Sequence, residues 1–202
     1  MNKEKAIDIV FHSARMYVRE IGYDTAWVNE VSIDKITAQD FFGEYIWVVY
    51  SSGFKVSRLE SLKKGLYRAY GDYRALDVGH RENVLNVINN KSKWNAVYRT
   101  AVAMQMFDWD DFKETYLDTI DSMMGLDFIG PKTKYHLARN LGFDVAKPDR
   151  WMCRLTEKLG WESVDSMCSY LSKKHDLKVK EIDLILWKYV SDLGIDGIDC
   201  TI

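Results

Sequence analysis

The sequence predicts an all-α fold, and three observations carry this prediction. Apolar residues recur at helical spacing through almost every segment of the 202 residues. Hydrophobic residues make up 47% of the chain and only two prolines interrupt it, as in an ordered globular protein. Glycines separate the periodic segments, at positions where helices commonly end. This length is enough for one large core or for two lobes that share a cleft.

The expected helices follow in order along the chain. They span 6–21, 41–50, 59–70, 84–88, 94–106, 112–124, 133–141, 149–159, 164–175 and 180–192. The apolar run around Trp47 also resembles a strand, but its neighbours keep helical spacing. Asp149 and Ser163 carry side chains that favour helix N-caps. The separating glycines are Gly22, Gly53, Gly71, Gly125, Gly142, Gly160 and Gly194.

Several classes of protein are disfavoured by composition. No apolar run approaches the roughly 20 residues that span a bilayer, and the N-terminal segment reads as an amphipathic helix without a signal-peptide core. A cytoplasmic protein is therefore expected, with no membrane partner. The three cysteines (Cys153, Cys168 and Cys200) and the four histidines show no metal-type spacing. We expect no metal and no other cofactor, and Cys153 and Cys168 are expected to pack as small apolar residues.

Charge is unevenly distributed along the chain. The net charge is −2, but residues 131–158 contain seven basic and three acidic side chains, and residues 52–74 contain six basic and two acidic. Residues 108–121 are acidic, with six carboxylates against one lysine. A protein with this pattern can carry a basic face while remaining nearly neutral overall.

The most informative segment, LDFIGPKTKYHLARNLGFDVAKPDRWMCR, begins at Leu126. It predicts a helix end, a tight turn at Ile129, Gly130 and Pro131, and a second helix from about Thr133. A further helix is expected to open at Asp149. The free N–H groups and positive dipole of a helix N-terminus suit a phosphate. An amine such as Lys132 near a carboxylate such as Asp149 suits attack on a sugar carbon.

These residues resemble the helix-hairpin-helix DNA glycosylase superfamily (HhH-GPD), which includes endonuclease III and the 8-oxoguanine DNA glycosylases. The usual hairpin run is L-P-G-V-G-x-K-T-A, followed after a helix by V-D-T-H or a variant. The matching residues are Leu126, Ile129, Gly130, Lys132 and Thr133, and then the segment from Pro148 to Trp151 with Asp149. Residues 44–62 and 89–102 resemble the family's early core helix and its N-x-K-A helix. The resemblance covers roughly residues 40–160.

The sequence departs from the family pattern at several positions. Phe128 replaces the first hairpin glycine, and the glutamine that often follows the early core helix is not evident around residues 51–55. Arg150 and then Trp151 follow the aspartate, where many members have a histidine. Three cysteines cannot build the four-cysteine iron–sulfur site that some endonuclease III relatives carry.

The resemblance implies a two-lobed fold with the hairpin at the rim of a cleft. One lobe would comprise residues 1–37 and 131–202, with the catalytic aspartate. The other would comprise residues 38–130 and lead into the helix-hairpin-helix at about 117–141. Such a protein would be a monomer that acts on double-stranded DNA with a damaged or modified base. It would be nucleoid-associated if bacterial, or lie in the host cytoplasm if encoded by a phage.

The resemblance also assigns roles to residues. Lys132 would attack C1′ of a flipped nucleotide and give a Schiff base, with strand cleavage to follow, while Asp149 would stabilise positive charge on the sugar. The alternative interpretation is structural: Lys132 would be a solvated lysine at a helix start, and Asp149 would be only a helix cap. The residues expected to contact DNA are Ile129, Gly130, Pro131, Thr133, Lys134, Lys55 and Arg150. The aromatic residues expected to line a base pocket are Phe54, Trp151, Trp47 and Tyr50.

Two other functions remain open at this point. Some proteins of the same fold build hypermodified thymines, joining an amino acid or polyamine to an activated hydroxymethyl group on DNA. The missing glutamine and the altered segment around Arg150 keep this alternative open. The second alternative is a module that binds DNA or a protein partner through the hairpin without catalysis.

Overall fold

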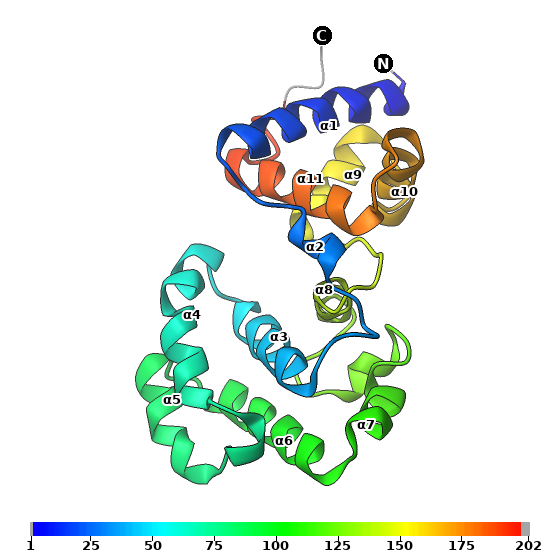
Figure 1. Cartoon of the computed structure of the whole chain (residues 1–202). Helices are drawn as coiled ribbons and strands as arrows, with labels where there is room; N and C mark the ends of the chain where they lie inside the picture. Colours follow the sequence, from blue (N-terminus) through cyan, green and yellow to red (C-terminus); the bar gives the residue numbers. More distant parts are fainter. Residues whose placement is uncertain (1, 199–202) are drawn as a thin grey trace. The chain divides into compact units, whose positions relative to one another are not determined.

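The computed structural model describes residues 2–198 of the chain, and within that range it confirms an all-α protein (Figure 1). Eleven α-helices and three short 3-10 helices are present, and the described residues form no strand. None of the helices within this range is long and apolar enough to cross a membrane. Cys200, one of the three cysteines considered above, lies outside the described residues.

The chain divides into two compact units. The terminal unit combines the residues up to Ile33 with those from Gly142 onward, and the central unit is Asp34–Leu141. The expected lobes changed at residues 37 and 131, so this division assigns the hairpin and the helix after it to the central unit. Lys132 therefore belongs to the central unit and Asp149 to the terminal unit.

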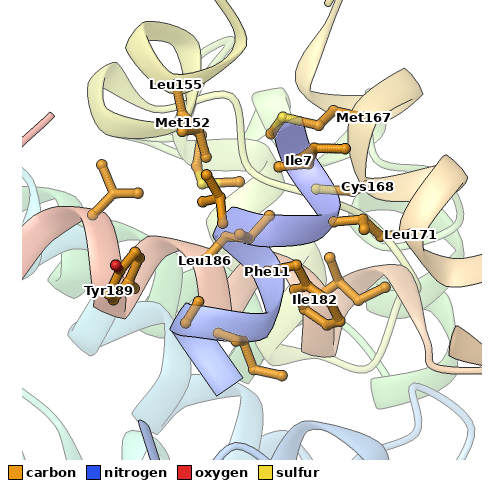
Figure 2. Packing of buried hydrophobic residues seen from close by; sticks show 14 of the residues in the cluster. Ile7, Phe11, Met152, Leu155, Met167, Cys168, Leu171, Ile182, Leu186 and Tyr189 are labelled. Carbon is orange, nitrogen blue, oxygen red and sulfur yellow. The ribbon is translucent and has the colours of Figure 1, made fainter. Parts of the chain in front are cut away.

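The terminal unit is built around its first helix. Its helices are α1 (Lys3–Glu20), α2 (Trp27–Glu30), α9 (Arg150–Leu159), α10 (Val164–His175) and α11 (Val179–Leu193). Figure 2 shows side chains of α1, such as Ile7 and Phe11, enclosed by apolar side chains of the other three long helices. Phe11 is fully buried, and burying a side chain of this kind contributes about 1.5–3 kcal/mol. Cys168 lies in this core and Cys153 packs against it, as expected.

The central unit has a core rich in aromatic rings. Its helices are α3 (Ala38–Ser51), α4 (Val56–Tyr70), η1 (Tyr73–Ala75), η2 (Val78–His80), α5 (Arg81–Val87), α6 (Lys91–Met106), α7 (Trp109–Tyr116), η3 (Ser122–Gly125) and α8 (Thr133–Asn140). Helix α3 is the middle element and packs against α4, α6 and α8. The buried aromatic residues of these helices are Phe41, Phe42, Tyr45, Tyr50, Tyr70, Tyr73, Trp94 and Phe112.

The expected single helix over residues 112–124 is wrong. Helix α7 ends at Tyr116, and a separate 3-10 turn, η3, follows from Ser122. Thr119 and Ser122 exchange hydrogen bonds between side chain and backbone, including Ser122 Oγ donating to the Thr119 carbonyl at 2.7 Å. Such local bonds compete with the helical pattern, which explains the break. The element before the hairpin is therefore one 3-10 turn.

Helix boundaries depend on capping residues. Ser163 caps α10, as expected, by accepting a hydrogen bond from the Ser166 N–H at 3.0 Å. Thr37 and Asn90 cap α3 and α6, so these helices begin about three residues before their first strongly apolar position. Gly160 ends α9 in the left-handed conformation, with φ of 72°, as expected of a glycine at this position.

Candidate functional site

The hairpin between η3 and α8 is held by hydrogen bonds of its own backbone and of Thr133. The Ile129 N–H donates to the Leu126 carbonyl at 3.2 Å, and the Gly130 N–H donates to Thr133 Oγ1 at 2.7 Å. The Thr133 hydroxyl lies 3.2 Å from the Phe128 carbonyl, to which it donates. Ile129 is buried and anchors the turn. The conformation is thus fixed by bonds within residues 126–133.

Phe128 adopts the left-handed backbone conformation, with φ of 63°. The family that the sequence resembles has its first hairpin glycine at this position. Glycine adopts this conformation without strain. A residue with a Cβ pays roughly 1–2 kcal/mol there. Phe128 is 43% exposed, so more than half of the residue is buried, and this burial offsets part of that cost.

The backbone N–H groups expected to hold a phosphate differ in availability. Gly130 was expected to contact DNA, and its N–H already donates to Thr133 Oγ1. The N–H groups of Lys132 and Thr133 have no acceptor among residues 2–198. Pro131 has no N–H, and the Lys134 N–H donates to the Gly130 carbonyl. Two adjacent free donors therefore stand at the start of α8, where the helix dipole favours an anion.

The two lysines of the hairpin have different surroundings. Lys132 is exposed, and its ammonium group contacts no carboxylate in the described part of the chain. The Lys134 ammonium forms an ion pair with Asp121, which raises the pKa of Lys134 through the hydrogen bond between them. Lys134 was expected to contact DNA, but here its charge is already partnered. Lys132 is the available cation of this turn.

Asp149 caps α9 in the terminal unit. Its Oδ1 accepts hydrogen bonds from the N–H groups of Trp151 at 2.9 Å and Met152 at 3.2 Å. The same oxygen accepts both bonds, so the other carboxylate oxygen keeps its lone pairs for a further partner. Capping is thus part of what Asp149 does, and it fixes the direction of the carboxylate.

The other predicted contact residues have varied environments. Lys55 precedes α4 and is exposed, as is Arg150, whose guanidinium lies 4.9 Å from the Trp151 ring centre. Trp151 is half-buried and packs against the core of the terminal unit.

The remaining base-pocket candidates belong to the central unit. Tyr50 is fully buried, and its hydroxyl lies 2.8 Å from that of Tyr70. It is therefore a core residue of the central unit. Trp47 and Phe54 are half-buried, each with a lysine ammonium over its ring.

Lys93 is a buried lysine that the sequence interpretation missed. Its side chain is 5% exposed, and Nζ donates to the carbonyls of Tyr50 at 3.0 Å and Ser52 at 2.5 Å. Burial lowers its pKa to about 8. A signal was present, because Lys93 lies on the same helical stripe as Val97 and Met104, which are buried. The ammonium satisfies carbonyls at the end of α3.

A carboxyl group also joins α3 to α8. Asn140 Nδ2 donates to Glu44 Oε2 at 2.8 Å. Burial raises the pKa of Glu44, although the hydrogen bond from Asn140 acts in the opposite direction. This contact fixes the C-terminal end of α8, the helix that begins beside Lys132.

A small pocket of about 170 Å³ lies next to the hairpin, entirely within the central unit. Its lining includes Arg99, Tyr116 and Asp127, and the Arg99 Nε donates to Asp127 Oδ2 at 2.6 Å. Gly125 also lines it, and a Cβ there would lie 3.2 Å from the Tyr116 ring. The pocket thus combines a cation, an anion and an aromatic wall.

Comparison with protein-family models, with curated proteins and with solved structures gives no match. Among residues 2–198 no group of three or more histidine, cysteine, aspartate or glutamate side chains is placed to hold a metal ion.

Proposed function

We propose that this protein binds double-stranded DNA through the hairpin and excises a damaged or modified base, with associated lyase activity. The observation that carries the proposal is the turn at the start of α8. There the free N–H groups of Lys132 and Thr133 accompany an exposed, unpaired lysine amine. Backbone donors at a helix N-terminus position a phosphate without reading sequence. A lysine amine beside that phosphate would be able to attack the adjoining sugar.

The proposed reaction begins with the neutral Lys132 amine. Its nitrogen forms a bond to C1′ while the bond from C1′ to the base breaks, and the base leaves with the electron pair and takes up a proton. Opening of the sugar ring gives the Schiff base. Loss of a proton from C2′ then expels the 3′ phosphate and cuts the strand. These steps require no cofactor.

Asp149 would stabilise the positive charge that develops on the sugar. Since Oδ1 accepts the two capping bonds, the second oxygen is the one proposed to face the substrate.

Strand cleavage tests the proposal. A duplex with one abasic site, followed by a panel of damaged bases, would be incubated with the wild type and with Lys132→Ala. We expect cleavage to fall at least about a hundredfold in the variant. Lys113→Ala is a matched control, because this lysine is paired with Asp110 of the same helix, α7. Equal cleavage by the wild type and Lys132→Ala would contradict the proposal.

A second function, modification of a DNA base, is favoured by the pocket beside the hairpin. Excision needs only DNA, whereas joining an amino acid to an activated base needs a site for a small second substrate. The Arg99 and Asp127 pair offers complementary charges for a carboxylate and an ammonium group, each of which would replace one partner of the present ion pair. Calorimetric titration with free amino acids, with Arg99→Gln as the comparison, tests this candidate.

A further inference from the structure

We infer that α7 and the adjoining end of α6 form a docking surface for a basic, amphipathic helical segment of another protein. The surface lies within the central unit. It combines exposed apolar residues with exposed carboxylates: Met106, Phe107, Met124, Asp108, Asp111 and Glu114. The inference goes beyond the proposed activity on DNA and does not rest on it, because carboxylates repel phosphates and this face is unsuited to DNA.

The apolar residues of the docking surface gather around Tyr116. Met106 is 79% exposed, and Phe107 and Met124 are each more than 40% exposed. The ring of Tyr116 lies 6.4 Å from that of Phe107, centroid to centroid. On its other side, a Cβ at Gly125, the residue after Met124, would lie 3.2 Å from the same ring. Single exposed apolar residues are common on soluble proteins, but grouped ones mark interaction sites.

The carboxylates of the docking surface follow directly along α7. Asp108 caps this helix immediately after the C-cap of α6, and Asp111 and Glu114 lie in its first two turns. All three are exposed, and none of them forms an ion pair among residues 2–198. Lys113, the basic residue of α7, is already paired with Asp110. The negative charge of this face is therefore uncompensated, and a basic partner would complement it.

The two parts of the surface together define the chemistry of the partner. The surface is hollowed, because Tyr116 and Gly125 also line the pocket described above, with Ala103 of α6. Apolar side chains along one face of a helix fit a hollow bordered by methionines, which adapt to side chains of different shape. Lysines or arginines on the flanks of that helix would reach the carboxylates. An acidic segment would be repelled, and a wholly apolar one would leave the carboxylates without partners.

Fluorescence anisotropy with a designed probe tests the inference. The probe is a labelled helical peptide with leucines along one face and lysines elsewhere. A peptide of the same composition, with its leucines scattered around the helix, is the comparison. We expect the wild type to bind the probe, more weakly as salt is raised, and to bind the scattered peptide about tenfold more weakly. Met106→Ser with Met124→Ser and, separately, Asp111→Asn with Glu114→Gln should each lower the affinity for the probe about tenfold.

The controls make matched changes elsewhere in the central unit. Val78→Ser removes an exposed apolar side chain of η2, and Glu60→Gln with Glu82→Gln removes exposed carboxylates of α4 and α5. These proteins should bind the probe as the wild type does.

Three results would overturn the inference. The first is a wild type that does not bind the probe or does not distinguish it from the scattered peptide. The second is wild-type affinity in both pairs of surface variants. The third is self-association of the wild type in sedimentation that the same substitutions abolish, because the face would then be a contact between copies of this chain.

Discussion

At the scale of single residues, Asp149 combines a structural role with a proposed catalytic one. Its Oδ1 accepts two backbone hydrogen bonds at the start of α9, which is capping. The proposed role depends instead on the negative charge. The two roles need different properties of the side chain, and conservative substitutions therefore separate them.

Asp149→Asn keeps an oxygen that can cap α9 but removes the charge. We expect its free energy of unfolding to stay within about 0.5 kcal/mol of the wild type, because asparagine caps as well as aspartate. Base release should fall about a hundredfold or more, since the charge facing the sugar is lost. Asp149→Ala should lose the same activity and also about 1 kcal/mol of stability. Chemical denaturation and a base-release assay measure both; full activity in Asp149→Asn would limit Asp149 to capping.

Lys93 gives a pH-dependent prediction. Its pKa is lowered from 10.5 to about 8 by burial in the folded protein. Between these pH values the unfolded chain binds more protons at this group, so its contribution to stability rises with pH across that window and is lost as pH falls through 8. Lys93→Met should lack this gain, which urea unfolding of both proteins at pH 7.5 and pH 9.5 would show.

At pH 7.5 Lys93→Met should also be less stable than the wild type, by about 1–3 kcal/mol. The Tyr50 and Ser52 carbonyls lose their donor, and buried carbonyls without a partner are costly. A stability difference that does not change with pH would contradict the assigned pKa.

At the scale of secondary-structure elements, the segment that follows α8 depends on one glycine. Gly142 has φ of +104°, and a Cβ there would lie 2.7 Å from the Val31 carbonyl oxygen and 2.8 Å from Ser32 Cα. Lys180 Nζ donates to the Gly142 carbonyl at 2.9 Å. The close approach of two backbones therefore fixes where the chain re-enters the terminal unit.

Gly142→Ala should destabilise the protein by more than about 2 kcal/mol, because strain and a backbone clash add together. Gly160→Ala is the matched comparison. Gly160 also has a positive φ, of +72°, but no atom lies within 4 Å of the position that an alanine methyl group would take there. We expect a cost of only about 1 kcal/mol for this substitution. Equal shifts in thermal unfolding for the two variants would show that the close approach is not tight.

Sequence reasoning located most of the helices correctly. It failed where local hydrogen bonds or tertiary contacts determine the structure. Periodicity identified nearly every long helix, and the N-cap role of Ser163 was correct. The break after Tyr116 was missed because it depends on hydrogen bonds between Thr119 and Ser122, and the spacing of apolar residues does not show such bonds. The short helix α2 has too few residues to show a period.

The geometry of the candidate site was only partly predictable for similar reasons. The hairpin turn could be located from Gly130, Pro131 and Thr133, but hydrogen-bond occupancy could not. The partnering of Lys134 with Asp121 and the use of the Gly130 N–H by Thr133 depend on side-chain geometry. The burial of Tyr50 depends on how α3 packs in the central unit, which its spacing alone does not reveal.

At the scale of the whole molecule, the two units differ in chain topology. The central unit is the continuous segment Asp34–Leu141, whereas the terminal unit is assembled from both ends of the chain. The central unit also has its own buried aromatic cluster, in which the rings of Tyr70 and Trp94 stack at 5.6 Å. A continuous segment with its own core has what a domain needs in order to fold alone.

We therefore expect a fragment of residues 34–141 to fold independently. Circular dichroism should show a helical spectrum and a cooperative thermal transition. The fragment includes the hairpin, so it should bind duplex DNA, but it lacks Asp149 and should release no base. A fragment without a cooperative transition would show that the central unit needs the rest of the chain.

The central claim is that the Lys132 amine forms a covalent bond with DNA, and borohydride trapping tests it most directly. Wild type and Lys132→Ala would be mixed with a duplex that carries an abasic site, reduced and separated by denaturing electrophoresis. Peptide mapping would then locate the cross-link. The account predicts a cross-linked band in the wild type, mapped to Lys132 and absent from the variant. A cross-link on another lysine, or no band from a protein that binds the duplex, would contradict it.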